Sequence, residues 1–155
     1  MVRIYIERSG NEINAAECLK KLSEDAKLKQ DFGLDTKLTF YSSVISHSYY
    51  SIFYAAKALL LTKDIRTDSP EIHKKTYDAF KKHFVDTGVL DVALLHIYSD
   101  LMIKADDLLE IFMEEKSKRG KFTYSTIPQA NKSPAEDSIR HAKFFAANIS
   151  KAIEK

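Results

Sequence analysis

Residues 38–62 contain neither glycine nor proline, and apolar side chains recur along them at intervals of three and four. This spacing places the apolar side chains on one face of an α-helix. The apolar positions are Tyr41, Val44, Ile45, Tyr49, Ile52, Phe53, Ala56, Leu59 and Leu60. We therefore predict a long helix over residues 38–62 that lies at the centre of the fold.

The start of the chain has a mixed pattern. Val2, Ile4 and Ile6 alternate as in a strand, whereas a helical stripe of apolar residues continues to Leu19. Because the helical spacing extends over more of the segment, we favour a helix over residues 3–29.

Helix-start signals precede two later segments. Residues 68–71, Asp-Ser-Pro-Glu, supply a cap, a proline suited to the first turn and an acidic side chain, and Gly88 ends the pattern, which predicts a helix over residues 70–85. Residues 133–136, Ser-Pro-Ala-Glu, form a capping box that begins a final helix. Between these signals, a seven-residue apolar repeat predicts a second long helix over residues 90–117.

These segments and their short links predict an all-α fold, an antiparallel helical bundle of about five helices in a single domain over residues 1–155. A chain of 155 residues can bury a core but is too short to make two domains the expectation. Four glycines and three prolines are too few for the tight turns of a β-sandwich. The formal net charge is +2, so an anion-binding surface would have to come from local clustering of basic residues.

The cysteine content and the hydropathy of the sequence indicate the cellular compartment. Cys18 is the only cysteine, so it cannot form an internal disulfide, and we interpret it as a small apolar filler of the first helix. No apolar run approaches the ~18 residues of a membrane span, and the charged start lacks the core of a signal peptide. We expect a cytoplasmic protein without membrane contact.

The histidines have no metal-ligand spacing, so no metal site and no cofactor is predicted.

Residues 116–125, KSKRGKFTYS, carry four basic side chains, two aromatic ones and no acidic one. Basic side chains can grip phosphates while aromatic rings stack on bases, as in proteins that bind single-stranded nucleic acid. The candidate ligand-binding residues are Lys118, Arg119, Lys121, Phe122 and Tyr124. The alternative is a basic loop whose aromatic side chains cover the core.

Three stretches resemble the HEPN domain family (higher eukaryotes and prokaryotes nucleotide-binding), in a branch of small prokaryotic proteins. Residues 46–61, SHSYYSIFYAAKALLL, are similar to its second-helix pattern, close to SRxYYAxFxAAxALL, with His47 where an arginine is common. Residues 73–90, HKKTYDAFKKHFVDTGVL, match HKxxxxxFxxxFVxTGxL. Residues 119–124, RGKFTY, fall where that branch carries RxxADY. The resemblance covers about residues 40–150.

This resemblance implies an all-α bundle that forms a homodimer and is often encoded beside a minimal nucleotidyltransferase as a toxin–antitoxin pair. Active members of the family are metal-independent ribonucleases with an arginine followed a few residues later by a histidine. In such chemistry the 2′-hydroxyl of RNA attacks the adjacent phosphate, so a base must take the proton and a cation must stabilise the phosphoryl oxygens. Arginine suits the second task because its planar fork matches phosphate geometry.

By position, Arg119 corresponds to the family arginine, and Tyr124 stands at the place of the histidine. A phenol ordinarily has a pKa of about 10 and is a poor base at pH 7, although it can hydrogen-bond a phosphate. This departure favours a weak or absent nuclease. His47 shares a predicted helix face with Tyr50 and Tyr54 and is a second candidate for the acid–base group, if that face meets Arg119 across the bundle or the dimer. The other interpretation of this face is a polar seam in the core or the dimer interface.

Arg66 and His73 also fit the arginine–histidine spacing, but they bracket a predicted helix start away from the family position. We interpret His73 as a partly exposed polar residue or the partner in a structural hydrogen bond. Their match to the motif is therefore expected to be fortuitous.

Three functional hypotheses follow. The first is a binding module, a homodimer that pairs with a nucleotidyltransferase or holds a nucleotide or RNA at Arg119 and its neighbours. The second is a metal-independent ribonuclease toxin with a degenerate motif, in which Arg119, Tyr124 and His47 are catalytic. The third is a structural bundle without a ligand. The missing motif histidine favours the first over the second, and Arg119 within a basic loop favours both over the third.

Overall fold

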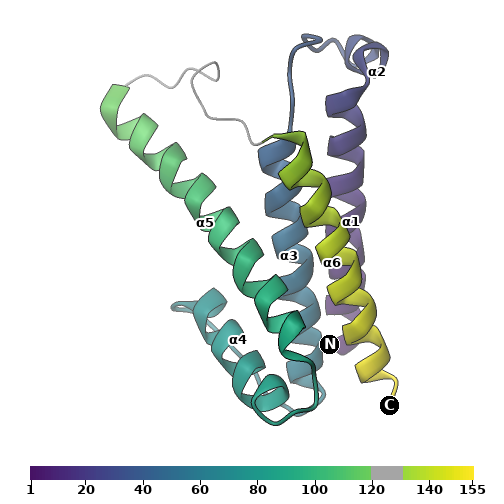
Figure 1. Cartoon of the computed structure of the whole chain (residues 1–155), viewed down its shortest axis with the longest axis vertical. Coiled ribbons are helices and arrows are strands. Elements are labelled where there is room, and N and C mark those ends of the chain that lie inside the picture. The colour runs from purple at the N-terminus through teal and green to yellow at the C-terminus, as the bar shows by residue number, and fades with distance from the viewer. Residues whose placement is uncertain (120–130) are drawn as a thin grey trace.

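The computed structural model describes the backbone of residues 1–119 and 131–155 and the side chains of residues 1–108 and 131–155 (Figure 1). Its elements are α1 (Val2–Glu24), α2 (Ala26–Asp31), α3 (Tyr41–Leu61), α4 (Ile72–Phe80), a π-helical continuation η1 (Lys81–Val85), α5 (Val92–Arg119) and α6 (Lys132–Ile153). The described ranges contain no strand. The predicted all-α helical bundle is confirmed.

Helices α1, α3 and α6 lie side by side along the long axis of the molecule (Figure 1). Helix α1 runs antiparallel to α3, whereas α6 runs in the same direction as α3. Helix α5 packs against α3 near its own N-terminal end and diverges from it toward its C-terminal end. Because α3 contacts α1, α4, α5 and α6, the predicted central position of this helix is confirmed.

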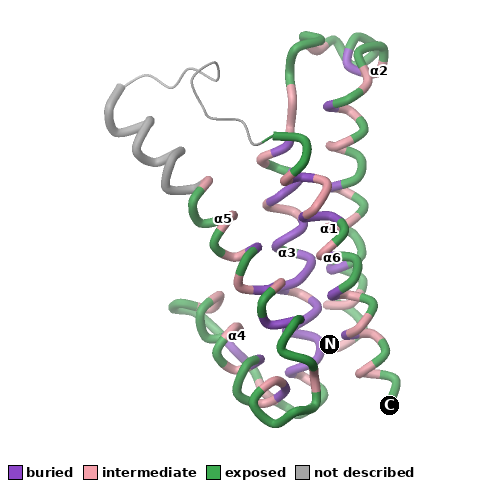
Figure 2. The backbone as a smooth tube through the Cα atoms, in the orientation of Figure 1, coloured by how far each residue is buried: buried purple, intermediate pink, exposed green. Residues whose placement is uncertain are grey.

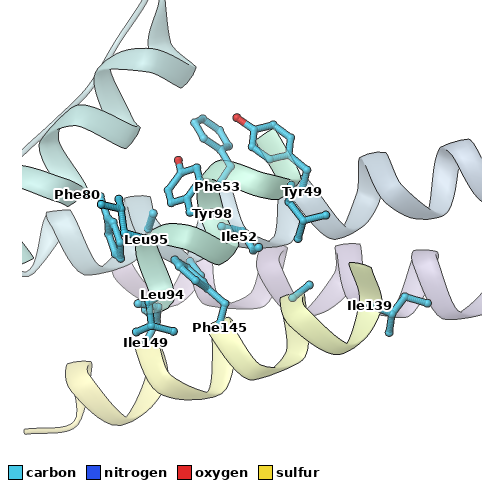
Figure 3. Close-up of a cluster of buried hydrophobic side chains, with 14 of the residues drawn as sticks. Tyr49, Ile52, Phe53, Phe80, Leu94, Leu95, Tyr98, Ile139, Phe145 and Ile149 are labelled. Atoms are coloured by element: carbon cyan, nitrogen blue, oxygen red, sulfur yellow. The ribbon is translucent and has the colours of Figure 1, made fainter. Parts of the chain in front are cut away.

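The hydrophobic core is built around α3, which is buried along most of its length (Figure 2). Ile52 and Leu60 of α3 are inaccessible to solvent or nearly so. Tyr98 of α5 and Phe145 of α6 are fully buried and meet in an edge-to-face contact, with ring centroids 5.8 Å apart (Figure 3). Aromatic side chains therefore join α5 and α6 over the central helix.

Small polar side chains hold α1 against α3. Ser9 and Ser51 are both buried, and the hydroxyl of Ser9 donates to the carbonyl oxygen of Ser51 at 2.8 Å. The two hydroxyl groups also lie 3.0 Å apart. Small residues at such a contact allow the two backbones to approach closely, so this pair fixes the register of α1 on α3.

The predicted helix over residues 3–29 is interrupted at Asp25, so residues 3–24 and 26–29 are helical as predicted but belong to two helices, α1 and α2. Asp25 is extended, with φ −114° and ψ 102°, and its carboxylate accepts a hydrogen bond from the backbone N–H of Leu28 at 2.9 Å. An aspartate side chain can compete with the helix ladder in this way and begin a new helix. The chain therefore turns into the short helix α2 before α3.

Two further helix starts differ from the sequence-based boundaries. Glu71 adopts the left-handed conformation, with φ +59°, so α4 begins at Ile72 and Pro70 does not lie in its first turn. Helix α6 begins at Lys132 with Asn131 as its N-cap residue and no side-chain capping hydrogen bond, so the predicted capping box at residues 133–136 is wrong. These differences shift boundaries without changing the order of the helices.

Cys18 is exposed on α1, so its interpretation as a buried filler is wrong. The fully buried Ala16 lies two residues earlier, and a step of two residues turns a side chain to roughly the opposite face of a helix. None of the helices in the described part of the chain is both long and apolar enough to cross a membrane.

Candidate functional site

Lys118 and Arg119 are the last two residues of α5. Their side chains, and the whole of Lys121, Phe122 and Tyr124, lie outside the described residues, so these candidates stay predictions. The position on α5 does bear on the basic side chains. Cations at a helix C-terminus are favoured by the helix dipole, by roughly 0.3–1 kcal/mol each, which gives Lys118 and Arg119 a structural role that needs no ligand.

His47 faces α1 and pairs with Glu12, with Nδ1 2.5 Å from the carboxylate oxygen. An ionised carboxylate has no proton to donate and can only accept a hydrogen bond. The Nδ1 of His47 is therefore the donor to Glu12. The imidazole is thereby oriented, and its Nε2 has no partner among the described residues. The structure brings His47 together with Glu12, and an approach of His47 to Arg119 stays a prediction.

The face shared by His47, Tyr50 and Tyr54 is divided between several neighbours. Tyr54 stacks on Tyr5 of α1 with ring centroids 6.0 Å apart. Tyr50 packs against His73 of α4 at 5.8 Å. The rings of Tyr50 and Tyr54 also contact each other, with centroids 6.3 Å apart, and the interpretation of this face as a polar seam stays a prediction.

His73 is on α4 and packs against aromatic side chains of α3. Its Nδ1 is 2.7 Å from the hydroxyl of Tyr49, and its ring centroid is 4.4 Å from that of Phe53. The interpretation of His73 as a partner in a structural hydrogen bond is confirmed. Arg66, its companion in the motif spacing, lines a pocket to which His73 does not contribute.

Burial determines the protonation states of His73 and Tyr49. Burial lowers the pKa of His73, the positive charge of Lys57 lowers it further, and Asp106 opposes the shift. Burial also raises the pKa of Tyr49, so its phenol stays protonated. At neutral pH Tyr49 therefore donates to Nδ1, and the ring proton of His73 lies on Nε2.

A pH dependence of stability follows from the lowered pKa of His73. The unfolded chain, in which histidine has its ordinary pKa of about 6.5, takes up a proton at higher pH than the folded protein does. The free energy of unfolding should therefore fall as the pH drops below about 6.5. Thermal melts from about pH 7.5 to about pH 5.5 should show a larger loss of Tm in wild type than in His73→Gln, whose amide oxygen can still accept from Tyr49. His96→Gln, at an exposed histidine, is the control, and identical pH profiles for wild type and His73→Gln would contradict the assignment.

A pocket of about 600 Å³ lies between α1 and α6. Nothing in the sequence indicated it. Lys20 lies 3.0 Å from Glu24 and 3.4 Å from Glu136, and Lys143 pairs with Glu17. Basic and acidic side chains of the pocket walls are thus already engaged in ion pairs with one another. Among the residues with described side chains, no three of the types His, Cys, Asp and Glu are grouped so as to hold a metal ion.

Comparison with known proteins places these features in a family context. The HEPN domain family matches residues 27–152, a range that contains every motif stretch quoted above. "Putative toxin MJ0605" of Methanocaldococcus jannaschii is 30% identical over 115 residues, which is 74% of this chain and 72% of that protein. "Putative toxin MJ0142" of the same organism is 43% identical over 61 residues, but the match spans only 39% of this chain and 40% of that protein. A "UPF0332 protein" of Thermotoga maritima is 29% identical over 140 residues, 90% of this chain and 86% of the relative.

Proposed function

Since the chain belongs to the HEPN domain family, we propose that it is the HEPN component of a toxin–antitoxin-type module, where it pairs with a minimal nucleotidyltransferase and binds a nucleotide or RNA. The names of two relatives contain the word toxin, which supports the module. The observation that carries the binding role is Arg119 at the family position within a cluster of basic side chains. We place the protein in the cytoplasm.

The proposed anion site must overcome an unfavourable backbone field. Arg119 ends α5, and a helix C-terminus carries a partial negative charge that repels phosphate. The positive charge of a single cation there would be partly offset by the partial negative charge of the helix end. Lys118 and Lys121 supply the further positive charge that phosphate binding requires, and Phe122 and Tyr124 offer rings on which bases can stack.

A ribonuclease is the second candidate, and the His47–Glu12 pair is the observation that favours it. A carboxylate that holds Nδ1–H fixes the ring and leaves Nε2 for proton transfer, which is the arrangement of a general base. In this alternative His47 replaces the base that Tyr124 cannot supply, and Arg119 stabilises the phosphoryl oxygens.

We further propose a homodimer. The chain itself buries Tyr41, Tyr49 and Phe53 of α3. The support comes from Tyr50 of α3, 39% exposed, and Ile103 of α5, 52% exposed, on the two helices that diverge in Figure 1. Light scattering of the purified protein tests this assembly, and a strict monomer at micromolar concentration would exclude it.

Arg119→Ala should weaken RNA or nucleotide binding by about 1–3 kcal/mol, the scale of a lost charge-assisted hydrogen bond. Its stability should change by no more than the roughly 0.3–1 kcal/mol that a cation contributes at a helix C-terminus. Binding is measured in chelator at two salt concentrations, since phosphate contacts weaken as salt rises. Arg140→Ala, at an exposed arginine of α6, controls for loss of charge alone. Binding that is equally strong in wild type and Arg119→Ala would reduce residues 116–125 to a basic loop.

Cleavage assays on the same RNA separate the two candidates. Under the binding proposal, Tyr124→Phe keeps its affinity and no variant cleaves RNA. Under the ribonuclease alternative, wild type cleaves in chelator, and both Arg119→Ala and His47→Gln lose that activity. Cleavage that survives Arg119→Ala would point to contamination or to another site.

A further inference from the structure

A second pocket, of about 100 Å³, lies where the C-terminal end of α3 meets α1 and the loop that follows α3. Its walls are formed by Met1, Tyr5, Lys57, Leu61, Ile65, Arg66, Thr67 and Asp68. In Figure 1 this end of α3 lies at the bottom of the bundle, beside the N-terminus, whereas the C-terminal end of α5 lies at the top. The pocket is therefore remote from the helix end that carries Arg119.

Lys57 contributes a buried ammonium group to this pocket. Its side chain is on α3, and the residue is only 9% exposed. Nζ donates to the carbonyl oxygen of Thr67 at 3.0 Å, and it lies 5.2 Å from the ring centroid of Tyr5 and 5.7 Å from that of Phe53. An ammonium has three N–H donors, and within the described residues Thr67 is the only acceptor found. For the other two N–H groups the described residues offer only the faces of the Tyr5 and Phe53 rings, so an acceptor in the pocket can bind them.

Arg66 adds a second cation at the rim. It is exposed, and its guanidinium has no ion pair or hydrogen bond within the described part of the chain. The planar fork of arginine can bind two oxygens of a phosphate at once. Asp68 is the one acidic residue in the lining, so the side chains of Lys57, Arg66 and Asp68 together leave a net positive charge.

The loop that carries Arg66 is held in place. Thr67 is buried, and its hydroxyl lies 2.7 Å from that of Thr76 on α4. Thr76 in turn donates to the carbonyl oxygen of Ile72 at 2.7 Å. On the other side of Arg66, the backbone N–H of Ile65 donates to the carbonyl oxygen of Leu60 at 3.1 Å. Because Ile65 and Thr67 are both held, the backbone at Arg66 does not have to be ordered when a ligand binds, which lowers the entropic cost of binding.

The size of the pocket limits the ligand. A volume of about 100 Å³ can hold one oxyanion, whereas the rest of a larger ligand would extend into solvent. The ring of Tyr5 is already occupied, by Lys57 and by the stacked ring of Tyr54, so it offers no surface for a base. The pocket therefore selects a small charged group.

We propose that Lys57 and Arg66 form a site for a single phosphate group, separate from the candidate site at Arg119. The two remaining donors of Lys57 bind phosphate oxygens from inside the pocket, and the guanidinium of Arg66 closes over the group from the rim. The phosphate comes from inorganic phosphate or from a phosphomonoester whose remainder stays in solvent. The carboxylate of Asp68 weakens the site by repulsion.

Titration of the full chain with inorganic phosphate tests this site, with chloride at matched ionic strength as the reference. Phosphate should raise the Tm of wild type beyond the effect of chloride, because a ligand that binds the folded state stabilises it. Arg66→Gln should weaken binding about tenfold or more, and Asp68→Asn should tighten it. Arg140→Gln, at an arginine that lines the pocket between α1 and α6 and not this one, should bind as wild type does. Lys57→Met should abolish binding, but because this change also affects a buried residue, the two rim variants decide the outcome.

Amide chemical shifts locate the bound group. Phosphate should move the resonances of Tyr5, Ile65 and Thr67, and a nucleoside monophosphate should move the same ones if a phosphomonoester is the source. Movement with inorganic phosphate alone identifies the free anion as the source. Three results would overturn the proposal: no effect beyond chloride, undiminished affinity in Arg66→Gln, or shifts confined to Lys118 and Arg119.

Discussion

Phe145→Ala should lower the free energy of unfolding by about 3–5 kcal/mol, the usual cost of removing a fully buried phenylalanine ring. Phe145 is 0% exposed on α6 and meets Phe80 of the α4 segment at 5.4 Å and Tyr98 of α5 at 5.8 Å between ring centroids. The ring therefore joins three elements. Because domains are commonly stable by only about 5–15 kcal/mol, this single loss is a large share of the total.

The neighbouring residue provides a matched control. Phe144 is 54% exposed, so Phe144→Ala removes the same ring from the same helix without opening a cavity and should change stability by less than about 0.5 kcal/mol. Urea denaturation of both variants measures the difference. Similar losses for the two variants would mean that α6 does not pack on the core through Phe145.

The central helix could be predicted because its pattern is strong at every level. Residues 41–61 combine helical periodicity with an apolar character that extends around most of the helix, which is the pattern of a helix surrounded by others. The break at Asp25 could not be predicted in the same way. Aspartate is tolerated within helices, and only the hydrogen bond from Leu28 shows that here it begins a new one. Glu71 likewise gives no sequence signal for its positive φ.

The candidate site was predictable to the level of motif positions and no further. The sequence placed His47 on a helix face, but its partner Glu12 lies 35 residues away and is brought close only by the register of α1 on α3. Lys57 did carry a signal, as a lysine within the apolar run AAKALLL. A charge there has either to reach solvent or to find buried acceptors, and periodicity alone does not say which.

Lys29 is a second buried lysine that the predicted helix over residues 3–29 did not identify. It is 4% exposed, and its Nζ lies 3.0 Å from the carbonyl oxygens of both Ser23 and Leu38. The carbonyl of Ser23 is in the last turn of α1, where the helix supplies no donor. Lys29 therefore ties the end of α1 to the segment that leads into α3.

Lys29→Met should lower the free energy of unfolding by about 3 kcal/mol, because two buried carbonyl groups lose a charged donor and gain no other. Lys27→Met, at an exposed lysine of the same short helix, should have little effect in the same urea denaturation. Methionine fills a similar volume and avoids the cost of burying an ammonium, which acts in the opposite direction. A Lys29→Met variant as stable as wild type would show that this desolvation cost cancels both hydrogen bonds. An apolar side chain in place of Lys29 leaves the carbonyl oxygens of Ser23 and Leu38 without this donor. A large loss of stability would therefore show that the junction of α1, α2 and α3 depends on the buried ammonium group.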